Sequence, residues 1–233
     1  MSFGPKPWHQ TNWDFRAAFN FVFGGAGAGL LLIVALSGLG GNAMRAEILL
    51  GMALIGAGLI SVWFEIGRPL RALHVGFNPF TSWMTRESYA AGAVFALGLA
   101  AAWLGSQSLA QATAVAALIF AYCQGRMLQA AKGVPAWRVP ALAWLNFTTA
   151  LTEGAGLFVA PLVGLALWFA PIGGLREDAH RLLAILGAVV VLWISEAIPL
   201  AVTALLGPTL CVLMGVVPAQ AGVNPAREIF RGL

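Results

Sequence analysis

Three carboxylates in or beside apolar segments are the side chains of this sequence best suited to chemistry. Glu65 ends one apolar segment, Glu87 opens the next, and Glu153 falls near the middle of a later one. Charges within membrane spans are costly and often mark proton or substrate routes. For the first two carboxylates the alternatives are a functional role or surface ion pairs with the nearby Arg68 and Arg86.

The Glu153 carboxylate belongs to a polar stripe in a long apolar segment. Asn146, Thr149 and Glu153 are spaced by three and then four residues, so they share one face of a helix. Such a stripe is typical of two arrangements. One is a proton route, which would use Asn146 and Glu153, and the other is a set of hydrogen bonds that only holds helices together.

Tyr122 precedes Arg126 by one helical turn, near the end of another apolar segment. A tyrosine at that depth is either a member of the aromatic belt of a membrane protein or a hydroxyl donor to a quinone carbonyl. The residue type and its depth favour neither interpretation over the other.

Several kinds of active site are excluded by the motifs that the sequence lacks. The three histidines, His9, His74 and His180, all lie outside the middle of an apolar segment, whereas membrane cytochromes hold haem with histidines inside their spans. No CxxC, GxSxG, P-loop or HExxH motif is present. The sequence therefore predicts no haem, no metal site and no catalytic residue in this chain, and whether it counts as an enzyme stays open.

The composition indicates which elements must position these residues. Of the 233 residues, 60% are hydrophobic and 9% are charged, against about 25% charged in soluble domains. We expect an all-α, polytopic transmembrane helix bundle that contacts membrane lipid and no nucleic acid. Five full spans are predicted, followed by a 36-residue apolar stretch, 182–217, that Pro199 and Gly207-Pro208 would break into a bent helix or hairpin. The five spans are 17–38, 47–65, 88–104, 110–130 and 140–169.

Basic residues predict the orientation of the bundle. The N-terminus, the loop between spans two and three, and the connection between spans four and five together carry eight Lys and Arg residues. The loops on the opposite side carry three. Because loops rich in Lys and Arg stay in the cytoplasm, we expect a cytoplasmic N-terminus. Nearly all the unusual polar residues lie on that same side.

Four sequence segments resemble one known family. The paired motif Glu65-Ile-Gly-Arg-Pro-Leu-Arg-Ala72 and Thr81-Ser-Trp-Met-Thr-Arg-Glu87 is the most specific of them. The glycine-rich run 21–30 and the loop 134–137 are the others. Over about residues 8–165 the chain resembles the membrane anchors of molybdopterin oxidoreductases, the NrfD/polysulfide reductase and dimethyl-sulfoxide reductase group.

The resemblance implies a haem-free anchor subunit in the bacterial inner membrane. It would bind quinone, either menaquinone or ubiquinone, and exchange electrons with a cytoplasmic iron–sulfur subunit beside a molybdopterin (Mo or W) catalytic subunit. Glu65 stands where several relatives have histidine, which leaves the hydrogen-bond donor to the quinone open. By position, the quinone site would contain Asn20, Glu65, Glu87 and Tyr122, and the docking face Arg68, Arg71, His74 and Arg86.

The end of the chain resembles a different family. Residues 178–220, with Trp193, Glu196 and Pro199 in the motif, resemble the opening spans of divalent anion:sodium symporters. The sequence therefore predicts a truncated anchor domain at 1–170 and a symporter-like apolar segment at 171–233. The alternative to the anchor function is a transport-related or non-functional chimeric membrane protein.

Overall fold

The structure, a computed structural model, describes residues 14–65, 69–131, 134–216, 226–227 and 230. Every long element among these residues is a helix, which confirms the expected all-α fold, and six helices are long and apolar enough to cross a membrane. The α-helices are α1 (Phe15–Ser37), α2 (Gly41–Trp63), α3 (Trp83–Leu104), α4 (Gln107–Ala130), α5 (Leu142–Phe169), α6 (Glu177–Ser195) and α7 (Leu200–Leu213). Two short 3₁₀ segments, η1 (Pro69–Phe77) and η2 (Pro135–Arg138), lie in the connections.

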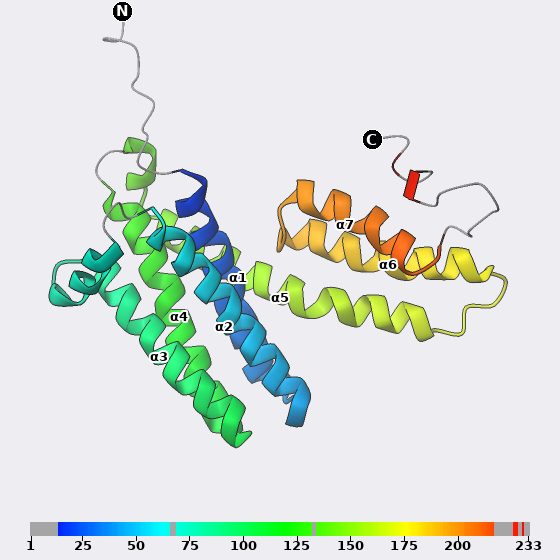
Figure 1. Ribbon diagram of the computed structural model, residues 1–233, viewed down its shortest axis with the longest axis horizontal. Helices are drawn as coiled ribbons and strands as arrows, with labels where there is room; N and C mark the ends of the chain where they lie inside the picture. Colours follow the sequence, from blue (N-terminus) through cyan, green and yellow to red (C-terminus); the bar gives the residue numbers. More distant parts are fainter. Residues whose placement is uncertain (1–13, 66–68, 132–133, 217–225, 228–229, 231–233) are drawn as a thin grey trace, which may run out of the picture.

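Helices α1 to α4 form a four-helix bundle joined at one end by tight turns (Figure 1). Gly38 and Gly105 end α1 and α3 with φ angles of 69° and 63°, a left-handed conformation that glycine adopts at low cost. Ser82 and Ser106 begin α3 and α4 by accepting a backbone N–H of the first turn. These local signals set the helix lengths and bring η1 to the end of the bundle at which α1 begins.

Two helices begin earlier than their apolar residues suggest. Helix α2 begins at Gly41, where hydropathy predicted 47, and α3 begins at Trp83, where it predicted 88. Apolar content marks only the part of a helix that faces lipid or core, whereas a cap such as Ser82 marks where the backbone turns. As a consequence, Arg86 and Glu87 lie within the first turns of α3.

Helix α5 joins the bundle to the rest of the chain. Its first half packs against α1 and α4, where Gly154 meets the backbone of Gly29 and Leu30 so closely that a Cβ on Gly154 would collide with it. Its second half extends out of the bundle, with α6 and α7 alongside (Figure 1). We call this second half with α6 and α7, residues 155–213, the arm.

The last apolar stretch folds as a helical hairpin, one of the two arrangements expected for it, but its break lies at one of the two expected sites only. Helix α6 ends at Ser195 and is followed by Glu196, whose φ is 52°, and α7 begins after Pro199. The expected break at Gly207-Pro208 is wrong, because Pro208 lies inside α7. A proline removes one backbone hydrogen bond, which a membrane helix tolerates. Since α6 alone reaches span length, the chain has six candidate spans among the described residues, where five and a hairpin were expected.

Candidate functional site

A cavity of about 650 Å³ lies at the end of the bundle where α1 and α3 begin and α2 ends. Its walls are mainly apolar and include Leu59, Trp63 and Met84. Four polar side chains of the sequence prediction line it, from α1, the end of α2, η1 and α3: Asn20, Glu65, His74 and Glu87. A cavity of this size with apolar walls and few polar groups is typical of a small-molecule site.

A buried polar cluster lies on the inner side of this cavity. The Asn20 Nδ2 donates to Glu87 Oε1 at 3.3 Å, and Gln124 Nε2 donates to the backbone oxygen of Asn20 at 3.0 Å. Asn20, Glu87 and Gln124 are 2%, 4% and 0% exposed. The side-chain oxygens of Asn20 and Gln124 accept no hydrogen bond within the described part of the chain. Buried polar atoms are normally paired, so the Asn20 oxygen, which is itself buried and faces Gly58 of α2, has an unused capacity to accept a hydrogen bond.

Glu87 does not pair with its sequence neighbour Arg86, so the surface ion pair considered for these two residues is wrong. Arg86 donates to the backbone oxygens of Pro79 at 2.8 Å and Phe80 at 2.7 Å, and its guanidinium lies over the Trp83 ring. Adjacent residues of a helix point in different directions, so Arg86 faces the loop while Glu87 faces the interior of the helix bundle. The buried carboxylate therefore has an amide as its partner.

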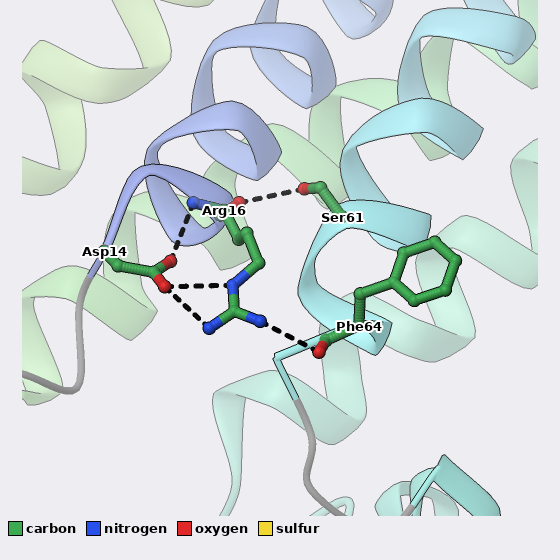
Figure 2. Close-up of polar contacts among 4 residues, drawn as sticks. All are labelled: Asp14, Arg16, Ser61 and Phe64. Atoms are coloured by element: carbon green, nitrogen blue, oxygen red, sulfur yellow. Dashed lines mark hydrogen bonds and ion pairs between the residues drawn. The ribbon is translucent and has the colours of Figure 1, made fainter.

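Polar contacts fix the rim of the cavity by tying the start of α1 to the end of α2 (Figure 2). Arg16 donates to Asp14 at 2.7 Å and to the backbone oxygen of Phe64 at 3.0 Å. Ser61 Oγ donates to the backbone oxygen of Arg16 at 2.8 Å. The hydrogen bonds from Arg16 hold the pKa of the Asp14 carboxyl below its ordinary value. The partly buried Glu65 follows Phe64 directly, so these contacts position it at the rim.

The remaining predicted residues lie elsewhere. Tyr122 does not line the cavity and instead contacts the rings of Trp83 and Trp144 on the outside of the bundle. Arg68 and the side chain of Arg71 lie outside the described residues.

The predicted polar stripe on α5 is divided among different neighbours. Asn146 donates weakly to the backbone oxygen of Ala121 on α4, at 3.5 Å, and Glu153 is buried beside Gly25 of α1. Thr149 is exposed. All three residues lie near one face of α5, as their spacing predicts, but Thr149 lies at the exposed edge of that face and Glu153 at its buried side. A proton route through Asn146 and Glu153 stays a prediction.

Sequence reasoning missed Gln124. The signal for it was an amide in an apolar segment, facing a span rich in glycine. Gly24 makes the space for this amide, since a Cβ there would lie 2.5 Å from Gln124 Nε2. To predict that Gln124 contacts α1 at Gly24, one must know which faces of α1 and α4 meet, and the sequence of neither segment contains that information.

Comparison with known families gives one match. The sequence model of the family described as DMSO reductase anchor subunit (DmsC) matches residues 11–198. No curated protein matches the chain. The match covers α1 to α6 and continues well beyond residue 165, the expected limit of the anchor resemblance. It runs into the segment that resembles symporters, and that second resemblance stays a prediction.

Proposed function

The chain belongs to the DMSO reductase anchor subunit family, and on this premise we propose that it binds quinone or quinol in the cavity between α1, α2, η1 and α3. It is a multi-pass membrane protein, and membership implies a complex with a catalytic subunit and an iron–sulfur subunit. In the proposal, electrons pass between the bound quinone and the iron–sulfur subunit, which docks on the same end of the bundle.

The observation that carries the proposal is the unpaired Asn20 oxygen beside the Glu87 carboxylate, at the inner side of an apolar cavity. A quinol presents hydroxyl donors at the edges of an apolar ring, and it carries an apolar tail. The volume of about 650 Å³ suits such a ring with the first part of its tail. The residues present therefore fit the group.

Each polar side chain that lines the cavity has a separate role in the proposal. Asn20 Oδ1 accepts a quinol hydroxyl and orients the ring, and the Glu87 carboxylate takes up one of the two protons released. Bound quinol supplies two electrons and two protons on oxidation. Glu65, partly buried at the rim, passes protons between the cavity and water. His74 is exposed where the cavity meets the surface, so it lies next to a docked partner.

The end of the bundle near the cavity is the proposed docking face. It carries Arg86 and His74 among the described side chains, and Arg68 and Arg71 belong to the same loop. The excess of basic residues in the loops at this end supports a cytoplasmic location in the bacterial inner membrane. We therefore propose that the partner subunits remain in the cytoplasm.

Substitution of Glu87 tests the proposal in the intact complex. Glu87→Gln keeps the shape and the contact with Asn20 but removes the proton acceptor, so quinol-coupled turnover should fall about 100-fold. Activity of the soluble subunits with an artificial dye should stay unchanged. Glu47→Gln, on the same bundle near the start of α2, is the matched control and should leave both activities unchanged. Unchanged quinol kinetics in Glu87→Gln would show that quinol does not react in this cavity.

A further inference from the structure

A cationic and aromatic cluster lies on the outer surface of the bundle, apart from the quinone cavity. Its five members come from α3, α4 and α5, and we call it the arginine–tryptophan cluster: Trp83, Arg86, Tyr122, Arg126 and Trp144. The guanidinium carbons of Arg86 and Arg126 lie 4.2 Å and 4.6 Å from the centre of the Trp83 ring. Trp83 is thus in cation–π contact with both guanidinium groups.

Arg126 has donors to spare. Its Nη1 donates to the Tyr122 hydroxyl at 3.0 Å, and its Nε, which has no partner in the described part of the chain, is buried, so the outer end of the guanidinium is the part that can reach a ligand. Neither Arg86 nor Arg126 forms an ion pair with a described acidic residue. Two guanidinium groups without a neutralising carboxylate make a site for an anion, and guanidinium matches the geometry of phosphate.

The surface of α4 next to the two guanidinium groups is apolar. Val115 and Ile119 of α4 are 59% and 52% exposed. Their spacing to Tyr122 and Arg126 is four, three and four residues, so all four side chains lie on one face of α4. Trp144 of α5 is 60% exposed beside them, and tryptophan is enriched at the boundary between headgroups and hydrocarbon. This face of α4 therefore combines a cationic end with an apolar stripe.

We propose that the arginine–tryptophan cluster binds an anionic phospholipid. The phosphate lies against the outer end of the Arg126 guanidinium, and the acyl chains follow Ile119 and Val115 along α4. An acidic surface of a partner protein would also suit the two charges, but it would leave the apolar stripe unexplained. The inference does not depend on the quinone site, because none of the cluster residues lines that cavity.

The proposal is tested by native mass spectrometry on the complex purified from membranes, titrated with phosphatidylglycerol or phosphatidylcholine of the same acyl chains. We expect a preference for phosphatidylglycerol, and Arg126→Gln should weaken its binding about five- to tenfold. Arg138→Gln removes an equal charge from the exposed η2 segment and should leave binding unchanged. If Arg126→Gln does not fold, Arg126→Lys provides the test, because it keeps the positive charge and loses the planar guanidinium group. We expect this variant to bind phosphatidylglycerol about threefold more weakly.

Four results would overturn the proposal. Equal binding of the two lipids would show that charge is not recognised. Unchanged phosphatidylglycerol binding in both Arg126 variants would place the lipid elsewhere. Complete displacement of phosphatidylglycerol by millimolar inorganic phosphate would show that the cluster is a site for the free anion. Phosphatidylglycerol binding that appears only when the soluble subunits are stripped away would assign the cluster to a partner protein.

Discussion

The two inner helices of the four-helix bundle, α1 and α4, bury many more of their residues than the helices of the arm, although all of these helices are apolar. In the most apolar parts of α1 and α4, 61% and 56% of the residues are buried within the protein, against 28% in α6, whereas the outer bundle helices α2 and α3 reach 28% and 33%. One large cluster of buried side chains fills the bundle, whereas two small ones hold the arm together. The large cavity with its buried polar cluster lies in the bundle. A firmly packed scaffold is what a site needs to hold unpaired polar groups in place.

Small residues explain the difference in packing. In hydrocarbon, helices associate through close contact of their surfaces, and glycine allows the closest approach. Gly27 of α1 faces the backbone of Gly51 on α2, and Gly125 of α4 faces that of Ala143 on α5. In the arm, the glycines of α5 and α6 face side chains such as Leu167 and Ser195. Close contacts between helix backbones are therefore concentrated in the bundle.

The largest expected effect comes from Gly154, where α5 leaves the bundle. Gly154→Ala would place a Cβ against the backbone of Gly29 and Leu30, which cannot move aside as a side chain can. We expect a loss of about 3 kcal/mol or more in the free energy of unfolding, measured by detergent-induced unfolding. The control is Gly92→Ala on α3, where an added Cβ meets nothing within 4 Å and should be neutral. Equal stability of the two variants would contradict the close crossing of α1 and α5.

A smaller effect compares two isoleucines directly. Ile55 is 0% exposed in the large cluster of the bundle, and Ile185 is 7% exposed in a small cluster of the arm. We expect Ile55→Ala to cost about 2 kcal/mol and Ile185→Ala less than about 1 kcal/mol, because lipid can fill part of the space that the shortened side chain leaves in the arm. The same unfolding measurement applies. A larger cost at Ile185 would reverse the ranking of the two regions.

The smallest effect concerns pH at the rim of the cavity. The pKa of Asp14 is lowered in the folded protein, so its stabilising contribution is complete at neutral pH and is lost as pH falls through that lowered pKa. Asp14→Asn keeps an acceptor for the cap of α1 and removes the charge. We expect the variant to have a slightly lower Tm than the native chain at pH 7, and the difference to disappear once the pH falls below the lowered pKa of Asp14. A difference in Tm that persists at low pH would assign the effect to the cap alone.

Composition and spacing predict much of this molecule. The apolar segments predict the number and order of the main helices, and Pro199 predicts the hairpin of α6 and α7. The expected grouping of Asn20, Glu65 and Glu87 agrees with the cavity lining, because loop positions and helix starts on one side of a membrane bundle converge. His74, expected on the docking face, also lines the cavity.

Other features depend on rotations of helices that a sequence does not specify. Tyr122 and Gln124 are two residues apart on α4, yet Gln124 faces the buried cluster and Tyr122 faces outward. Glu87 follows Arg86, yet the two side chains have separate partners. In both cases the faces of the helices that meet in the bundle decide the outcome, and the glycines of α1 set those faces.

A quinone site at Asn20 and Glu87 is best tested by photolabelling of the intact complex with an azido-quinone, followed by mapping of the labelled peptides. We predict labelling of α1, η1 and the start of α3, suppressed by excess quinol and greatly reduced in Glu87→Gln. Labelling confined to the arm, or labelling of the bundle that excess quinol does not suppress, would contradict the proposed site.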